Sequence, residues 1–305
     1  MEDNPENLAD GEISQTDSIR LGLSDSFKDI EGYAKGESAG VPTGFRDLDN
    51  LTAGGFHPGE LSILGGVAGT GKTSLALAIT ATASIEFKKA CLYVSTKDTT
   101  KGLTQRILNA QAGVNGFLLR TGRLPQRNFP KLSLAVGPLS GAPIEFYCQP
   151  RTQLRKVVEA ARSLREQRRL ELLVVDHLQM VLVNPQQQNK YEDVTIVVNE
   201  LKRLARELDI PVLALSSMNR SARDRYSAEP RLSDLGDSGA IETTSDVVHL
   251  LHRPEMFDPE EERGKAQIIV AKQNLGPTGT IPLTFIADYS TFVKYSYEKT
   301  DSSGF

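Results

Sequence analysis

The residues with the clearest chemical potential form one short run after an apolar segment. The run reads Gly66, Val67, Ala68, Gly69, Thr70, Gly71, Lys72, Thr73 and Ser74. Up to Thr73 it fits the pattern G-x4-G-K-[ST], between an apolar stretch at Leu61–Leu64 and an amphipathic stretch at Thr73–Phe87. Glycines here let backbone N–H groups curl around phosphates, while the amino end of the following helix faces the negative charge. We therefore expect the run to bind the phosphates of ATP.

Two side chains of this run and one further carboxylate are expected to act on the bound nucleotide. Lys72 should reach the β- and γ-phosphates, and Thr73 should offer its hydroxyl to Mg²⁺. A second apolar stretch, Leu172–Val175, ends at Asp176, where such a carboxylate sits beside the metal, usually through a water. An acidic residue at the end of a strand can also simply begin a turn. With the phosphate run upstream, we predict an Mg²⁺ site at Thr73 and Asp176, with Lys72 and Asp176 as catalytic residues.

These residues need a scaffold, and the sequence predicts one of alternating strands and helices. Apolar segments predict strands at Leu61–Leu64, Ala90–Ser95, Ile144–Tyr147, Leu172–Val175 and Val212–Leu215. Amphipathic segments predict helices at Thr73–Phe87, Thr99–Ala112, Thr152–Arg168 and Val194–Leu208. This order predicts a doubly wound α/β core with a mostly parallel sheet that is covered on both faces. Near the end, Gln267–Lys272 and Thr280–Ile286 flank a glycine-containing turn and predict a β-hairpin.

The start of the chain has a different pattern. Residues 1–17 are polar and acidic, and we expect a disordered tail there, without a secretory signal. Apolar residues then recur at helical spacing from Ile19 to Tyr33, and the small residues of Gly36–Gly44 follow as a linker. We thus predict a helix and linker over 18–40, an ATPase domain over 41–296 and a disordered tail over 297–305. The apolar face of the helix needs a partner, which a neighbouring subunit would supply.

Composition narrows the class of protein without choosing the function. Of 305 residues, 39% are hydrophobic and 24% charged, and no apolar run approaches the length of about 20 residues that a membrane span needs. We expect a cytoplasmic protein with no membrane contact. Cys91 and Cys148 both lie in apolar segments, which favours small core residues over a disulfide or a metal site. The net charge of −4 argues against a general polyanion binder but leaves open a local basic stripe.

The amino-acid sequence around these motifs is specific enough to indicate a protein family. The segments are GVPTGFRDLDNLTAGGFHPGELSIL, the phosphate run, LLVVDHLQM, LSSMNR, RLSDLGDSGAIETTSD and AKQNLGPTG. Over nearly all of Gly40–Val293 the chain resembles the C-terminal ATPase domain of DnaB-type replicative hexameric helicases. The resemblance implies a RecA-like fold, a ring of six, ATP at the subunit interfaces and single-stranded DNA in the centre. The scaffold domain that precedes this domain in the family is expected to have no counterpart here.

The resemblance also implies roles for further residues. Gln179 matches the family's glutamine after the metal-binding aspartate, and Lys272 matches a lysine of the family's hairpin, so both join the catalytic set. The stretch Asn219–Arg231 matches a mobile loop that faces DNA. The DNA-binding residues implied in this region are Arg220, Arg223, Arg225, Gly236, Asp237 and Gly239. Arginines in a loop are as often a solvated surface, and only the family context favours phosphate contact.

Four positions depart from the family's pattern. Lys97 stands where the family has the glutamate that polarises the attacking water, and Asn274 stands where it has an arginine finger. Ser217 replaces the glutamine that links nucleotide state to the DNA loops, and Gly236 replaces an arginine that contacts the DNA backbone. Because a protonated lysine accepts no proton and asparagine has no charge, hydrolysis should be slow.

Two readings of the function therefore stay open. The first is an ATP-driven helicase or translocase on single-stranded DNA, built as a homo-oligomer, with replication proteins as partners. The second is a catalytically degenerate nucleotide-binding relative that assembles with itself or with a full-length helicase. A recombination or clock-type ATPase is disfavoured by the stretch LSDLGDSGAIE.

Overall fold

The computed structural model describes residues 19–34, 40–183, 190–219, 229–235, 238–258, 260–261 and 263–295. The chain divides into two units, residues 1–39 and residues 40–305. The first unit contributes one described element, the helix α1 (Ile19–Ala34), which agrees with the helix expected at this position. None of the described helices is long and apolar enough to cross a bilayer.

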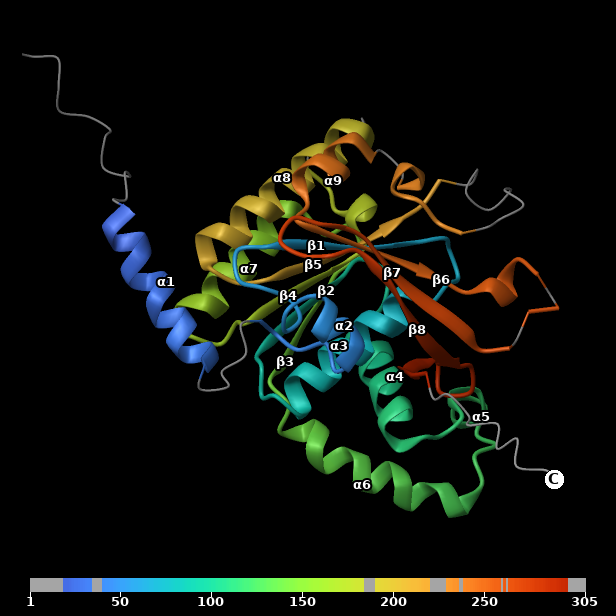
Figure 1. Cartoon of the computed structure of the whole chain (residues 1–305). Helices are drawn as coiled ribbons and strands as arrows, with labels where there is room; N and C mark the ends of the chain where they lie inside the picture. Colours follow the sequence, from blue (N-terminus) through green and yellow to red (C-terminus); the bar gives the residue numbers. More distant parts are fainter. Residues whose placement is uncertain are drawn as a thin grey trace, which may run out of the picture. The chain divides into compact units, whose positions relative to one another are not determined.

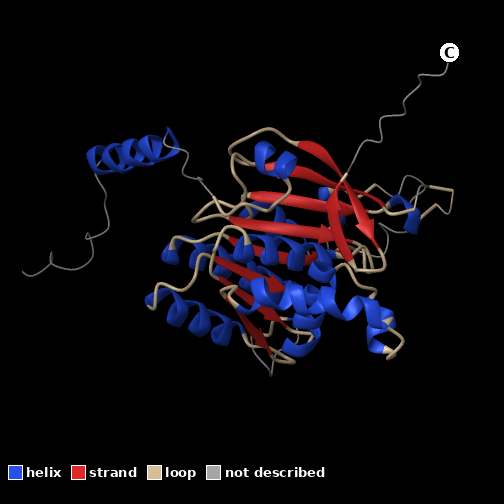
Figure 2. Cartoon of the chain, turned by 90° about the horizontal axis from the view of Figure 1, so that it is seen from below, coloured by secondary structure: helices blue, strands red, loops and turns tan. Residues whose placement is uncertain are grey.

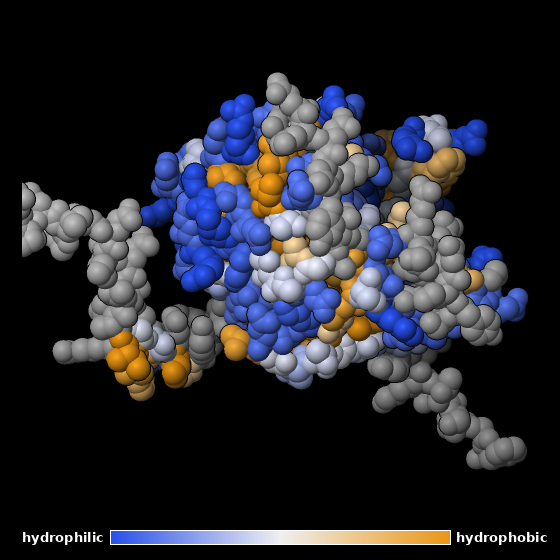
Figure 3. Space-filling model, turned by 90° about the horizontal axis from the view of Figure 1, so that it is seen from above, coloured by the Kyte–Doolittle hydropathy of each residue, from blue (hydrophilic) through white to orange (hydrophobic). Residues whose placement is uncertain are grey.

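One face of α1 is apolar and exposed. Ile19, Leu23, Phe27 and Ile30 follow one another at intervals of one helical turn and are each more than half exposed. At the left of Figure 3 they form an orange surface on this helix. Residues three and four apart share a helix face, so these four side chains form a single stripe. No described residue of the same unit covers this stripe.

A nine-stranded sheet forms the centre of the second unit, in the order β3-β2-β4-β5-β1-β6-β7-β8-β9. The parallel part comprises β3 (Ile144–Cys148), β2 (Cys91–Ser95), β4 (Leu172–Asp176), β5 (Val212–Ser217), β1 (Leu61–Gly66) and β6 (Val247–His252). The antiparallel part comprises β7 (Lys265–Gln273), β8 (Gly279–Ile286) and β9 (Thr291–Lys294). This arrangement confirms the predicted doubly wound, mostly parallel α/β fold.

Helices cover both faces of the sheet (Figures 1 and 2). One layer contains α2 (Arg46–Leu51), α3 (Lys72–Ile85), α4 (Thr100–Ala112) and α6 (Phe129–Ser140). The other contains α7 (Leu154–Glu166), α8 (Lys190–Leu208) and α9 (Ser238–Thr244). The short helix α5 (Gly116–Arg120) lies between α4 and α6 in the chain. The α7 sequence shows why a helix packs here, because Leu154, Val157, Val158 and Ala161 form one buried stripe at helical spacing.

Alternation along the strands divides the core into two halves. In β2, Leu92 and Val94 pack in the cluster with α7 and α8, whereas Cys91 and Tyr93 pack in the cluster with α3 and α4. Successive side chains of a strand point to opposite faces, so a strand buried on both sides is apolar throughout. Cys91 is buried and Cys148 half-buried, and both are free thiols. Burial raises the pKa of Cys91 to about 12.

The structure also contains elements that the sequence did not predict. The strand β6 lies beside β1, and β9 extends the predicted hairpin, whose first strand β7 pairs with β6 as well as with β8. The helix α6 was also missed, because Gly137 and Pro138 interrupt its pattern and only Lys131 is charged. The expected helix ends differ from the observed ones by a few residues.

His249, in the middle of β6, is a buried ring whose two nitrogens have no hydrogen-bond partner among the described residues. Its neighbour Phe56 meets it edge-on at 5.8 Å between ring centroids. Burial lowers the pKa of His249 from its usual value of 6.5 to about 4. The neutral ring is therefore the form that fits the core.

This burial predicts a loss of stability in acid. The unfolded chain takes up a proton on His249 below about pH 6.5, whereas the folded chain resists it down to about pH 4, so stability falls across this window as the pH falls. Between pH 7.5 and pH 5 the contribution of His249 should fall by about 2 kcal/mol. Urea unfolding of the wild type and of His249→Leu at both pH values measures this fall. The contributions of other titrating groups to the free energy of unfolding cancel in the difference between the two proteins. A difference that is the same at both pH values would contradict this account.

Candidate nucleotide-binding site

The phosphate run forms a tight loop between β1 and α3, and glycine is required at several points. Gly69 and Gly71 have φ angles of 90° and 99°, in the left-handed region. A Cβ on Gly66 would lie 2.8 Å from the Thr70 hydroxyl oxygen and 3.1 Å from the carbonyl oxygen of Leu251. The loop therefore exposes backbone in front of the amino end of α3, a helix of 14 residues.

Lys72, the first residue of α3, is held inside this loop. Its ammonium donates to the carbonyl oxygens of Gly66 at 2.7 Å and of Val67 at 3.2 Å, and the residue is only 8% exposed. Burial lowers the pKa of Lys72 to about 8, with the nearby Asp176 raising it and the nearby Lys97 lowering it. The cation thus sits where phosphate oxygens would replace the two carbonyls as acceptors.

Asp176 ends β4 and is positioned by Tyr93 of the neighbouring strand β2 and by Thr96, which directly follows β2. The Tyr93 hydroxyl donates to Asp176 Oδ2 at 2.9 Å, and the backbone N–H of Thr96 donates to the Asp176 carbonyl at 2.9 Å. Burial and the adjacent carboxylate both raise the pKa of Tyr93, so its proton stays in this bond. Sequence reasoning missed Tyr93. A tyrosine in a buried strand was the available signal, because its hydroxyl needs a partner.

A cavity of about 860 Å³ brings these residues together over α3. Lys72, Thr73, Ser74 and Asp176 line it, as do Lys97 from the turn after β2 and Arg106 from α4. Residues of α5 and of the turn between β8 and β9 also line it. There the Asn115 amide donates to Asp288 Oδ1 at 2.8 Å, and the Gly116 N–H donates to the Asp288 carbonyl at 3.1 Å. The cavity is large enough for a nucleotide.

The cavity lining fits an Mg²⁺-bound nucleotide in which the protein supplies few of the ion's ligands. The hydroxyl of Thr73 and the carboxylate of Asp176 lie in the same cavity. The described residues contain no group of three or more His, Cys, Asp or Glu side chains that would hold a metal by themselves. Mg²⁺ commonly binds through one or two protein ligands together with phosphate oxygens and waters, so this sparse set agrees with that ion.

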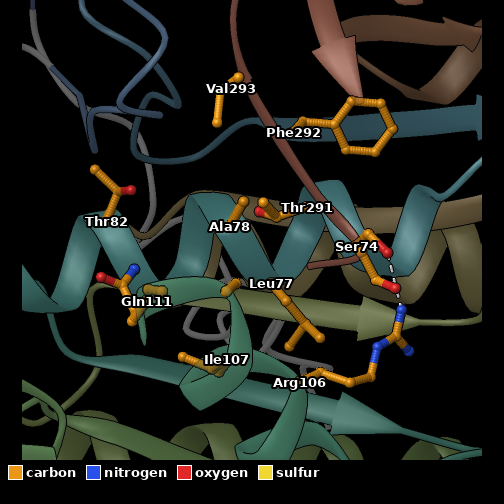
Figure 4. Close-up of a pocket in the computed structure, with 13 residues that line it drawn as sticks. Ser74, Leu77, Ala78, Thr82, Arg106, Ile107, Gln111, Thr291, Phe292 and Val293 are labelled. Carbon is orange, nitrogen blue, oxygen red and sulfur yellow. Dashed lines mark hydrogen bonds between the residues drawn. The ribbon is translucent and has the colours of Figure 1, made fainter. Parts of the chain in front are cut away.

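A second, smaller cavity of about 200 Å³ lies between α3, α4 and β9. Figure 4 shows its apolar wall of Leu77, Ala78 and Ile107, with Phe292 above α3. At its edge, Arg106 Nη2 donates to Ser74 Oγ at 2.9 Å. Arg106 thereby ties α4 to the first turn of α3 and forms a wall of both cavities.

Gln179 does not line the large cavity but joins β4 to β5 beside it. Its amide nitrogen donates to Ser216 Oγ at 2.8 Å, and its carbonyl oxygen accepts from the Ser217 N–H at 3.2 Å. His177 and Ser217, which both line the cavity, share a hydrogen bond of 2.6 Å between Nε2 and Oγ. Neither His177 nor Ser216 was expected from the sequence. Ser217, expected to weaken coupling, contacts His177 and Gln179, one and three residues after Asp176.

Lys272 and Asn274 lie at the opposite edge of the sheet. Lys272 Nζ donates to the carbonyls of Glu242 at 2.6 Å and Ser245 at 2.5 Å, at the end of α9. Asn274 donates from its backbone to the Asp246 carbonyl at 3.0 Å and from its side chain to Asp246 Oδ1 at 3.3 Å. Asp246 precedes β6, whereas the phosphate loop follows β1, so a strand length of roughly 20 Å separates them. The catalytic role expected for Lys272 would need the site of a neighbouring subunit.

Most of the expected DNA-binding residues lie outside the described residues. These are Arg220, Arg223, Arg225, Gly236 and Asp237. Gly239 is the second residue of α9. Asn219, the first residue of the expected loop, lies beside Asp234, which follows the loop, because the Asn219 N–H donates to the Asp234 carbonyl at 2.8 Å. The loop thus starts directly after β5, the strand that carries Ser217.

Known proteins match both this sequence and this structure. The family model for the DnaB-like helicase C-terminal domain matches residues 40–294. The replicative DNA helicase DnaC of Bacillus subtilis is 34% identical over 280 residues, which cover 90% of this chain and 62% of that protein. The replicative DNA helicase DnaB of Geobacillus stearothermophilus is 35% identical over 260 residues, covering 85% and 57%. The chain thus spans about three fifths of the length of these curated relatives.

Two solved structures are also similar. The ATPase domain of G40P superposes with a TM-score of 0.86 at 27% identity, over 92% of this chain and all of that one. A DnaB-like replicative helicase, described with its interactions with primase, superposes with a TM-score of 0.83 at 27% identity, over 92% of this chain and 68% of that one. Both matches agree with the RecA-like fold expected from the sequence.

Proposed function

The chain belongs to the family of DnaB-like helicase C-terminal domains, and on this basis we propose that it binds ATP with Mg²⁺ and drives an oligomer along single-stranded DNA. The observation that carries the proposal is the single cavity in which the glycine loop, Lys72, Thr73 and Asp176 meet. Each of these residues was assigned from the sequence to the same nucleotide. The family membership supports DNA replication as the setting.

In this proposal each residue has a defined role. The backbone N–H groups of Gly66–Ser74 bind phosphate oxygens, and Lys72 exchanges its two carbonyl acceptors for the β- and γ-phosphates. Thr73 and Asp176 hold Mg²⁺, and Tyr93 orients the Asp176 carboxylate. When bound, the ion neutralises charge on the phosphates.

DNA contact and assembly follow from the same proposal. Phosphate contacts are assigned to the arginines between Arg220 and Arg225, and the bridge from Gln179 to β5 carries the nucleotide state toward them. The exposed stripe of α1 packs on a neighbouring subunit of a ring, which we propose to be a hexamer in the cytoplasm. One solved relative is described with primase, and a replication protein of that class is a proposed partner here.

A second candidate is favoured by two observations. Lys97 lines the cavity at the position where a carboxylate would activate water, and Asn274 is bound to Asp246 of its own chain. Both changes remove groups that accelerate phosphoryl transfer. The second candidate is therefore a subunit that binds ATP and assembles, alone or with a complete helicase, while hydrolysing ATP slowly.

One experiment separates the two candidates. ATP hydrolysis at steady state is measured with and without single-stranded DNA, beside the affinity for Mg²⁺-ATP. DNA-stimulated turnover near the median rate of enzymes, about 10 per second, supports the motor and excludes the slow subunit. Tight ATP binding with negligible turnover supports the slow subunit. A chain that binds no ATP would overturn both.

A further inference from the structure

Lys97 stands at a fixed point beside the phosphate loop. It follows β2 by two residues, and the N–H groups of Lys97 and Asp98 donate to Ser95 Oγ at 3.4 and 3.0 Å. Its other neighbour, Thr96, is bonded to the backbone of Asp176. The backbone that carries Lys97 is therefore anchored to both central strands of the site.

Lys97 lines a cavity in which the carboxylates of Asp98 and Asp288 are engaged by other residues. Asp98 lies 3.7 Å from the guanidinium of Arg106, which also bonds to Ser74. Asp288 accepts from Asn115. No carboxylate among the described residues pairs with Lys97, although it lines the cavity together with Lys72 and Thr73. Lys97 is thus an exposed cation in the same lining as the phosphate-binding residues, with no paired carboxylate among the described residues.

The two lysines of the cavity repel each other until an anion binds. Lys97 is close enough to contribute to the lowered pKa of Lys72, together with the larger effect of burial. A triphosphate relieves this repulsion more than a diphosphate does, because it carries additional negative charge to the γ-position. Hydrogen bonds between charged partners are among the strongest in proteins. The electrostatic gain therefore depends on the last phosphate.

We propose that Lys97 binds the γ-phosphate of ATP and makes the cavity select nucleoside triphosphates over diphosphates. The inference rests on the proposed nucleotide function and adds to it a determinant of ligand choice. Lys97 stands where the family has the glutamate that activates water. In this proposal it holds the triphosphate instead. Bound ATP then stays in the site and signals the nucleotide-bound state to the other subunits of the assembly.

Affinities for Mg²⁺-ATP and Mg²⁺-ADP, measured by calorimetry on the full chain, test this role. Lys97→Met should weaken ATP binding by about 10- to 100-fold and ADP binding by less than about threefold. Lys97→Arg should keep most of the preference, because the charge remains. Lys101→Met is the matched control, since Lys101 is exposed on α4 and outside the cavity lining, and it should change neither affinity.

The outcomes separate this inference from the proposed function. An unchanged ratio of ATP to ADP affinity in Lys97→Met would overturn the role of Lys97 while leaving nucleotide binding in place. A wild-type chain that binds neither nucleotide would overturn both. Lys97 is exposed, so its variants should melt at the wild-type temperature, and their affinities then report on the site itself.

Discussion

The double variant Lys97→Glu/Asn274→Arg is expected to hydrolyse ATP at least about 100-fold faster than the wild type. A carboxylate at position 97 would accept a hydrogen bond from the attacking water, in a turn already anchored to Asp176. An arginine at position 274 would keep the backbone bond to Asp246 and would replace the short amide with a longer, charged side chain that acts on the γ-phosphate of a neighbouring subunit. Arginine fingers supply about 10³- to 10⁵-fold in well-studied systems, so most of the gain should come from this second change.

Turnover per subunit at saturating Mg²⁺-ATP, with single-stranded DNA present, measures the gain. Lys101→Glu is the control, because it makes the same charge change on α4 outside the cavity. Each single variant should gain less than the pair, since the two groups act on the same phosphate. Turnover that stays at the wild-type level in an assembled double variant would show that these positions do not limit hydrolysis.

Lys72→Ala is expected to weaken binding of ATP and ADP alike, by about 100-fold or more. The ammonium is the cation held within the loop, and its removal also takes away its hydrogen bonds to the carbonyls of Gly66 and Val67. Loss of affinity for both nucleotides distinguishes Lys72 from Lys97, whose variant should affect mainly ATP.

The same nucleotide titrations measure this loss. Lys89→Ala is a matched control, because Lys89 pairs with Glu171 at 2.8 Å and does not line the cavity. The control should bind both nucleotides as the wild type does. Wild-type affinity in Lys72→Ala would place the nucleotide elsewhere and refute the proposed site.

The expected chemistry is divided between two edges of one sheet. Lys72, Thr73 and Asp176 follow the carboxyl ends of β1 and β4, whereas Lys272 and Asn274 lie by Asp246, before β6. Any action of the second group on a nucleotide therefore requires a neighbouring subunit, and this makes assembly part of the proposed mechanism. The measurement of turnover in an assembled oligomer is informative for that reason.

Local patterns in the sequence were sufficient to predict the phosphate loop and the strands that carry it and Asp176. The glycine spacing of Gly66–Thr73 and the apolar run before Asp176 depend on neighbours along the chain. The structure places them at the carboxyl ends of β1 and β4, two buried strands separated by β5. The strand β6 was missed because its run contains His249 and His252, which interrupt an apolar pattern. Tertiary burial overrode that polarity, and the result is a buried histidine whose ring nitrogens have no hydrogen-bond partner in the described part of the chain.

The sequence by itself determined the family, the parallel core and the residue types available for phosphate and metal, because each depends on spacing within short segments. Only the tertiary structure decided how those types pair across the sheet. Tyr93 on Asp176, Ser217 on His177, Arg106 on Ser74 and Asn274 on Asp246 are contacts between segments far apart in the chain. A hydrogen bond needs a distance of about 3 Å and an aligned donor, which strand order and register set. The phosphate loop could therefore be predicted from the sequence. The place of Lys97 in the cavity lining, with no paired carboxylate among the described residues, could not.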